Sequence, residues 1–137
     1  MRKSKNDYFG YVCPRCFSQL QDCECPRFPQ TLLQIDRGIQ RVVRTLNRKG
    51  YVTTGCCEGH YNEGGYSATY ICFLEDYSAL HASPLPDGFT FDKGKFGVIY
   101  VYPRGESEER FAARHVSRLI ALHQWADNLP ENMDAEQ

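Results

Sequence analysis

The stretch YVTTGCCEGHY, residues 51–61, is the part of the sequence around which the predicted fold is arranged. Its first seven residues are rich in β-branched and aromatic side chains, which favour a strand. Two adjacent cysteines, a glycine and a histidine lie near its end, so potential metal ligands and reactive groups gather where the strand stops. We therefore expect a strand whose last residues and following loop form a functional site.

A helical pattern leads into this stretch over residues 37–49. Asp36 stands where an N-cap is favoured, and Gly50 stands where a glycine commonly ends a helix. The apolar side chains recur at the spacing of one helix face, at Ile39, Val42, Val43 and Leu46. Opposite them lies a set of four arginines, here called the arginine row: Arg37, Arg41, Arg44 and Arg48.

The arginine row has two interpretations. It is either a solvated helix face, helped by the good helix propensity of arginine, or a surface that binds the phosphates of a nucleic acid. Residues 1–50 carry ten Lys/Arg against four Asp/Glu, a net +6, whereas residues 51–137 carry six against thirteen, a net −7. The N-terminal half is therefore the side expected to meet an anionic partner, either nucleic acid or an acidic protein.

Further strands and a second helix complete the predicted domain. Residues 66–74 alternate in polarity and should form a hairpin with residues 51–57, and residues 89–92 and 96–102 should form another. The second helix spans residues 107–128 and begins at the capping residue Ser107. The predicted fold class is α+β: a mainly antiparallel sheet of about four strands packed with two helices on one face, plus an N-terminal zinc knuckle.

The second helix carries its own predicted stripes. Its inner stripe is Phe111, His115, Leu119, Leu122 and Ala126, with Val116 beside it. Arg110, Arg114 and Arg118 form a second basic row, flanked by Trp125. Glu106 stands four residues before Arg110, a spacing at which opposite charges on a helix pair.

The N-terminal cysteines are the most specific motif in the chain: Cys13, Cys16, Cys23 and Cys25. The CxxC and CxC pairs can present four thiolates, which satisfy tetrahedral zinc at distances of about 2.3 Å. An iron–sulfur cluster takes four cysteines as well, and chance clustering is the alternative without a metal. Four protein ligands leave no open coordination position, so this zinc site is expected to be structural.

The overall composition places the chain among small globular proteins of a reducing compartment. It has 137 residues and seven cysteines, an odd number that favours metal ligation or thiol chemistry over disulfides. The N-terminus is basic but has no apolar signal region, and no apolar run reaches the roughly 20 residues that span a bilayer. We therefore expect a cytoplasmic protein that does not enter a membrane.

The second cysteine group, near His60, has three interpretations. In the first, its cysteines are buried residues that behave as small apolar side chains. A second metal site would use Cys57 and His60, whose CxxH spacing suits two ligands on one turn, with Cys72 as a third ligand or with His115 or His123. Alternatively, His60 would activate Cys57 as a nucleophile in an enzyme.

Several of these motifs together resemble a group of uncharacterised small proteins from bacterial and phage or mobile-element genomes. The resemblance rests on CPxC, CEC, LNRKGY, the CCxGH element and the strand YICF, over about residues 13–73. It implies a small cytoplasmic zinc-knuckle protein in phage or mobile-element biology. A weaker likeness is to the wybutosine-synthesis methyltransferase family, to which Cys57 and Gly59 could correspond, although His60 stands where that family has arginine.

The sequence thus predicts a zinc-binding module that contacts nucleic acid or an acidic protein partner. The alternative is an enzyme that uses Cys57 and His60 in thiol or metal chemistry, distantly similar to RNA modification. A third possibility is an adaptor whose knuckle docks on a partner. The predicted organisation is a basic tail and zinc knuckle in residues 1–29, an α+β domain in residues 30–130, and a disordered acidic tail in residues 131–137.

Overall fold

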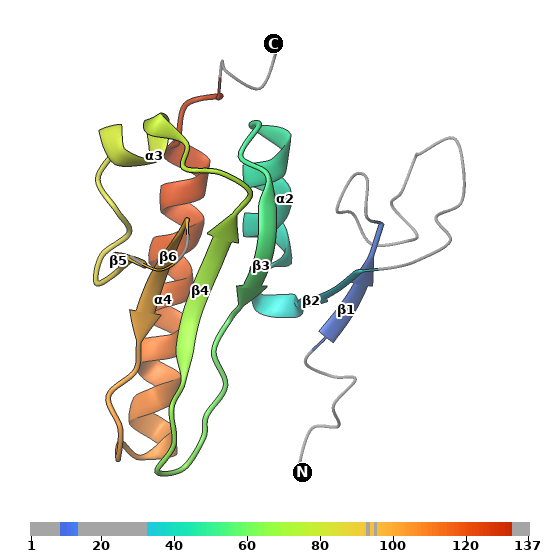
Figure 1. The fold of residues 1–137 in the computed structure, drawn as a ribbon. Coiled ribbons are helices and arrows are strands. Elements are labelled where there is room, and N and C mark those ends of the chain that lie inside the picture. The colour runs from blue at the N-terminus through green and yellow to red at the C-terminus, as the bar shows by residue number, and fades with distance from the viewer. Residues whose placement is uncertain (1–8, 14–32, 93, 95, 133–137) are drawn as a thin grey trace.

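The computed structural model describes residues 9–13, 33–92, 94 and 96–132, and its centre is a four-stranded antiparallel sheet (Figure 1). The strand order is β3-β4-β6-β5. The two longer helices, α2 and α4, lie side by side on one face of this sheet, and the short helix α3 lies near its end (Figure 1). The predicted α+β class and antiparallel sheet are therefore confirmed.

The elements follow one another in the order expected from the sequence. The helices are the 3-10 helix η2 (Arg37–Ile39), α2 (Gln40–Arg48), α3 (Ser78–Ala82) and α4 (Glu108–Asn128). The strands are β1 (Phe9–Val12), β2 (Leu33–Asp36), β3 (Thr53–Cys57), β4 (Ala68–Phe73), β5 (Thr90–Asp92) and β6 (Gly97–Val101). β1 and β2 form a separate antiparallel ribbon beside β3 and α2 (Figure 1). β1 thus lies within the stretch predicted to be a tail and knuckle.

Both predicted hairpins are present, and their register decides which face each cysteine occupies. Cys57 pairs with Tyr70, and Cys56 pairs with Ile71. Ile71 is fully buried and Cys56 packs against the core, so this pair faces the helices. Because successive residues of a strand point to opposite faces, Cys57 and Tyr70 face away from the helices.

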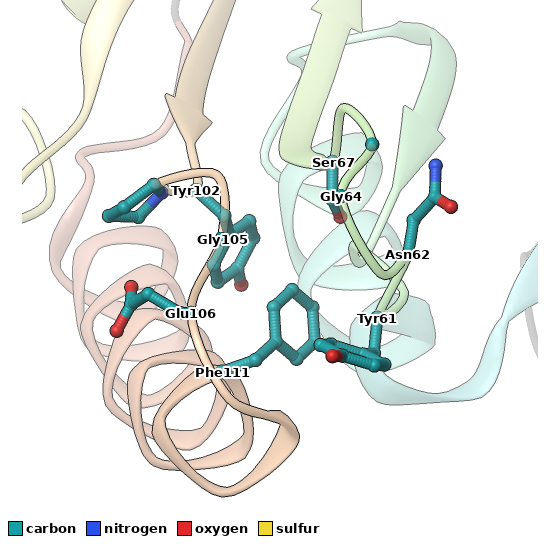
Figure 2. Close-up of a pocket in the computed structure, with 10 residues that line it drawn as sticks. Tyr61, Asn62, Gly64, Ser67, Tyr102, Gly105, Glu106 and Phe111 are labelled. Atoms are coloured by element: carbon teal, nitrogen blue, oxygen red, sulfur yellow. The ribbon is translucent and has the colours of Figure 1, made fainter.

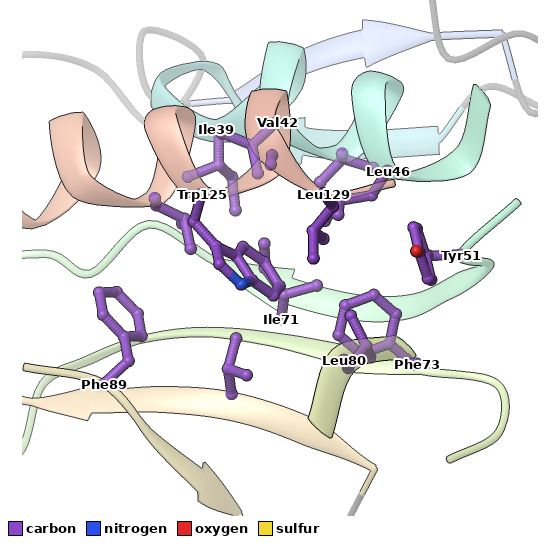
Figure 3. Close-up of a cluster of buried hydrophobic side chains, with 14 of the residues drawn as sticks. Ile39, Val42, Leu46, Tyr51, Ile71, Phe73, Leu80, Phe89, Trp125 and Leu129 are labelled. Carbon is purple, nitrogen blue, oxygen red and sulfur yellow. The ribbon is translucent and has the colours of Figure 1, made fainter. Parts of the chain in front are cut away.

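The core lies between the sheet and the two helices. The four apolar residues predicted for α2 and the turn before it are all essentially inaccessible to solvent. Figure 3 shows Ile39, Val42 and Leu46 facing the sheet residues Ile71 and Phe73. Burying an aliphatic side chain of this size stabilises a fold by about 1.5–3 kcal/mol, so this face holds α2 in place.

The N-terminal cap of α4 is as predicted, but part of its packing is not. The Ser107 hydroxyl accepts a hydrogen bond from the Arg110 backbone N–H at 3.2 Å. Val116, predicted to lie beside the inner stripe, is 56% exposed, and Trp125, predicted to flank a basic row, is a core residue with 6% exposure. Trp125 lies three residues after Leu122 and directly before Ala126, so helical geometry places it on the buried stripe.

The second basic row also differs from the prediction. Glu106 pairs with Arg114 Nε at 2.5 Å, not with Arg110. The prediction failed because α4 begins at Glu108, so Glu106 lies in the preceding loop and helical spacing does not apply to it. Arg118 donates to the backbone carbonyl of Asp87 and lies 5.1 Å from the ring centroid of Tyr100, so it belongs to the packed structure.

Two features lie outside the elements that the sequence predicted. Helix α3 occupies part of the predicted loop 75–88 and contributes the buried side chain of Leu80. At the C-terminus, Asn132 is buried and its side-chain amide donates to the Gly50 carbonyl at 3.0 Å, so the ordered chain continues beyond Pro130. Among the described helices, none has the length and apolarity that crossing a bilayer requires.

Candidate metal centre

Three potential metal ligands meet where β2 and β3 end. Asp36 is the last residue of β2, Cys57 is the last residue of β3, and His60 lies three residues further on in the loop. One ligand atom from each of these residues lies within 4.8 Å of the other two. The group combines a carboxylate oxygen, a sulfur and an imidazole nitrogen, so it could hold a metal ion.

Asp36 occupies the predicted N-cap position, which is that of η2, but it does not play the predicted capping role. Its side chain makes no cap hydrogen bond. Instead, Asp36 Oδ2 accepts a hydrogen bond from the Glu58 backbone N–H at 2.8 Å and lies 3.2 Å from His60 Nε2. The approach of the loop after β3 gives the carboxylate a donor that a local helix pattern does not reveal, and it orients Asp36 toward the site.

The turn between Cys57 and His60 is held in place by hydrogen bonds between side chains and its backbone. The Thr69 hydroxyl donates to the Glu58 carbonyl at 2.6 Å, and the Gly59 N–H donates to Cys57 Sγ at 3.4 Å. Gly59 has φ +88°, a left-handed conformation that glycine adopts without steric cost. These constraints place the Cys57 and His60 side chains beside Asp36.

A carboxylate–histidine pair, in which the carboxylate is buried, lies directly behind this turn. Glu58 Oε2 is 3.2 Å from His115 Nε2, and the Gly38 N–H donates to Glu58 Oε1 at 3.4 Å. Burial alone would raise the pKa of Glu58, but the hydrogen bond and charge of His115, together with the Gly38 N–H and His60, outweigh burial and hold this pKa below its ordinary value. His123 Nε2 lies 3.3 Å from the Gly38 carbonyl. His115 therefore supports the turn and His123 contacts η2, and neither histidine belongs to the metal-ligand group.

The environment of Cys57 does not provide the activation that a nucleophilic cysteine needs. Burial, followed by the nearby Asp36 carboxylate, raises the pKa of the Cys57 thiol to about 11, although the Gly59 N–H opposes this rise. A thiol with such a pKa carries little thiolate at neutral pH. His60 Nε2, the atom expected to activate it, lies against the Asp36 carboxylate.

Cys72, the predicted third ligand, lies on β4 two residues away from Tyr70, the residue that pairs with Cys57. It pairs with Gly55, whereas Cys57 pairs with Tyr70, so a two-residue separation of about 7 Å along the strand lies between them. The described ligand group includes Cys57 and His60 but not Cys72.

Tyr70 is the neighbour of Cys57 that the sequence analysis missed. The pKa of the Tyr70 hydroxyl is raised first by burial and then by Cys57. Cys56 is on the other face, and burial raises its pKa to about 12.

The predicted N-terminal zinc knuckle falls mostly outside the described residues. Cys16, Cys23 and Cys25 are not described, and Cys13 is buried directly after β1. Phe9 of β1 pairs with Asp36, so Cys13 lies at the opposite end of the ribbon, four residues or about 13 Å away along the strand. A zinc ion bound by these four cysteines would therefore be separate from the Asp36 group.

The arginine row runs along η2 and α2 and starts beside Asp36. Arg37, Arg41 and Arg48 are exposed, and Arg44 is half-buried. Arg41 forms an exposed ion pair with Asp127 at 3.5 Å. Exposed pairs of this kind contribute about 0–1 kcal/mol, so this ion pair could be broken at little cost in stability.

Figure 2 shows a small cleft between the loop after His60 and the start of α4. Tyr61 and Phe111 line it, with ring centroids 5.6 Å apart. Its volume of about 10 Å³ is close to that of a single water position. A larger groove of about 340 Å³ lies between residues 83–87 and α4, and none of the three ligand residues lines it. The three ligand residues line neither of these two hollows.

The structure brings two predicted site residues, Cys57 and His60, together with one that was assigned another role, Asp36. Asp36 was missed because it stands directly before a predicted helix, where an aspartate is usually interpreted as a cap. Comparisons with protein-family models, curated proteins and solved structures find no match for this chain.

Proposed function

We propose that this protein binds one zinc ion at Asp36, Cys57 and His60. The observation that carries the proposal is the approach of three chemically different ligand atoms to within 4.8 Å. Ligand atoms around tetrahedral zinc lie about 3.5 Å apart at metal–ligand distances of about 2.0–2.3 Å, so a small contraction would complete the site. A set with both sulfur and imidazole favours zinc over calcium or magnesium, which prefer oxygen ligands.

Three protein ligands leave the fourth position of a tetrahedral zinc ion open. Zinc sites with an open position bind or transform a ligand, whereas structural sites are closed by four protein ligands. The support around the three residues also suits a metal site, because the Glu58 N–H orients Asp36. If the protein is an enzyme, its chemistry is therefore expected at this open position and not at a cysteine nucleophile.

Metal analysis of His60→Ala tests this proposal. Purified without chelator, the variant should contain one zinc equivalent fewer than the wild type, because two remaining ligands hold zinc weakly. Cys23→Ser should separately lose the equivalent predicted for the N-terminal knuckle. His81→Ala is the matched control, since His81 is half-exposed and pairs only with Asp76 among described acidic residues. Equal zinc content in wild type and His60→Ala would refute the Asp36 site.

A second candidate function is contact with nucleic acid through the arginine row. The observation that favours it concerns Arg44 and Arg48: neither side chain forms an ion pair with an acidic residue in the described part of the chain. Like charges at helical spacing cost about 0.2–0.5 kcal/mol per pair, so a partner that supplies anions would stabilise this face. Phosphates and the carboxylates of an acidic protein both meet that requirement.

The salt dependence of binding separates the arginine row from general charge attraction. Arg44→Gln combined with Arg48→Gln should flatten the slope of log affinity against log salt by about two phosphate contacts, with little change in stability. Arg104→Gln with Arg110→Gln is the charge-matched control, since both residues are exposed outside this face. Titration with labelled RNA and DNA provides the measurement. The same slope for both double variants would exclude the row.

A further inference from the structure

We infer that the groove between residues 83–87 and α4 is a binding site for a small, neutral, two-ring heteroaromatic molecule of the purine class. The inference is independent of the proposed zinc site, because none of the three ligand residues lines this groove. Four observations support it: the volume of the groove, the fixed position of its walls, the lack of an unpaired charge among its lining residues, and two amide side chains on α4.

The groove has the size and lining of a small-molecule site. Its volume of about 340 Å³ falls within the range of roughly 300–1,000 Å³ that is usual for ligand pockets, and is about twice that of a cavity of roughly 150 Å³ that holds benzene. Pro84 and Pro86 line it on one side, and Trp125 and Leu129 line it on the other. A flat molecule with two fused rings therefore suits both the volume and the apolar walls.

The wall opposite α4 is fixed in the absence of a ligand. Arg118 Nη1 donates to the backbone carbonyl of Asp87, and the Phe89 N–H donates to the Pro86 carbonyl at 3.0 Å. The side chain of Leu85 packs against the core. A preformed groove loses little conformational freedom on binding, so it can hold a ligand that makes few contacts.

The groove offers no unpaired charge to a ligand. Asp87 is the only charged residue among those that line it. The Asp87 carboxylate lies 3.6 Å from Arg118 Nη1, and its side chain is 90% exposed, so it is both paired and hydrated. A phosphate or carboxylate would meet no cation among the lining residues, and a cationic ligand would gain little from an exposed, screened carboxylate. The groove therefore favours a neutral base over a nucleotide.

Two amide side chains provide the polar part of the site. Gln124 and Asn128 both line the groove, are exposed, and form no side-chain hydrogen bond with any described residue. They are four residues apart, a spacing at which side chains are neighbours on one helix face. An amide both donates and accepts, which matches the adjacent acceptor and donor on one edge of adenine. A purine with this edge would replace the water bound to the amides, whereas an apolar ligand would only displace that water.

The fluorescence of Trp125 tests the inference directly, because Trp125 is the single tryptophan of the chain and lines the groove. Adenine is the probe, with excitation at the red edge of tryptophan absorption, where adenine does not absorb. The full-length protein should show a saturable change in emission, with a Kd between about 10 µM and 1 mM, as expected of a ligand with about ten non-hydrogen atoms. The analogue 6-dimethylaminopurine keeps both rings but cannot donate from its exocyclic nitrogen, so it should bind roughly fivefold more weakly.

Variants of the groove supply the second readout. Gln124→Met and Asn128→Leu replace the amides by apolar side chains of similar size, and each should weaken adenine binding roughly fivefold to tenfold. Ala121→Phe should abolish binding, because the added ring would occupy the groove while both amides remain. Asn62→Leu is the matched control, since Asn62 is an exposed amide outside this groove. Circular dichroism checks the fold of each variant, and His60→Ala should bind adenine as the wild type does.

The outcomes separate this ligand class from other occupants of the groove. Saturable adenine binding that weakens with 6-dimethylaminopurine and in both amide variants supports the inference. Equal affinity for adenine and naphthalene, or equal adenine affinity in the wild type and both amide variants, would mean that the amides do not recognise the base edge, and would overturn it. Tighter binding of adenosine monophosphate than of adenine, or no change in emission and no calorimetric heat up to the solubility limit of adenine, would overturn it as well. None of these results depends on whether zinc binds at Asp36, Cys57 and His60.

Discussion

Gly59→Ala is expected to lower the free energy of unfolding by about 2–4 kcal/mol and to remove the metal bound at Asp36, Cys57 and His60. The left-handed conformation of Gly59, φ +88°, costs a residue with a Cβ atom about 1–2 kcal/mol. That Cβ would also lie 2.9 Å from Tyr102 Cε2 and 3.0 Å from Thr69 Oγ1. Both neighbours are buried and joined by a 2.8 Å hydrogen bond, so neither can move aside cheaply.

The metal effect follows from the same contact. Thr69 also donates to the Glu58 carbonyl, so a displaced Thr69 would release the turn that places Cys57 and His60. Gly64→Ala is the matched control: Gly64 has φ +70°, but an added Cβ there would meet no atom within 4 Å. Urea denaturation gives the stability of both variants, and metal analysis gives their zinc content. Equal losses in the two variants, with the zinc retained, would show that the turn is not constrained in this way.

The sheet and the two long helices could be predicted because their signals are local. The apolar residues of α2 recur at helical spacing, and all of them are buried against the sheet. The start of α4 follows from the Ser107 cap and the acidic residues after it. Helix α3 was missed because its five residues are too few to show a period, and its stability depends on Leu80 entering the core.

The candidate site could be predicted only in part, because it depends on contacts between distant segments. Cys57 and His60 are three residues apart, and their spacing alone suggested a shared site. Asp36 joins them because β2 ends next to β3, an approach that no local pattern encodes. Its position before a helix suggested a cap, which is a good local rule that the tertiary structure overrides.

The choice between Cys72 and Tyr70 as the neighbour of Cys57 depends on strand register. β3 contains an irregularity between Thr53 and Gly55, which shifts the pairing with β4. A shift by one residue exchanges the two faces of a strand, so a hairpin predicted from alternation alone cannot say which β4 residue lies opposite Cys57. The structure places Tyr70 there and brings a phenol to the border of the site.

Lys49→Met is expected to lower the free energy of unfolding by about 2–3 kcal/mol while leaving metal binding intact. The Lys49 ammonium group donates to the carbonyls of Ala126, Asp127 and Leu129 at 2.9, 2.7 and 2.7 Å, so all three of its N–H groups are used. These carbonyls end α4, where the helix dipole favours a positive charge. Hydrogen bonds to a charged group are worth about 1.5–3 kcal/mol, and partial access of water reduces the sum of three.

Arg48→Met separates this role of Lys49 from a general effect of charge. Arg48 is the preceding residue, is exposed, and forms no ion pair among the described side chains, so its loss should change stability by less than about 0.5 kcal/mol. Hydrogen exchange should also localise the Lys49 effect to the last turn of α4 and to Tyr51, whose hydroxyl donates to the Pro130 carbonyl at 2.5 Å. Equal stability of the two variants would mean that water replaces the ammonium group at the end of α4. A difference of about 2 kcal/mol would mean that a single lysine joins the end of α2 to the end of α4 and so fixes the two helices that cover the sheet.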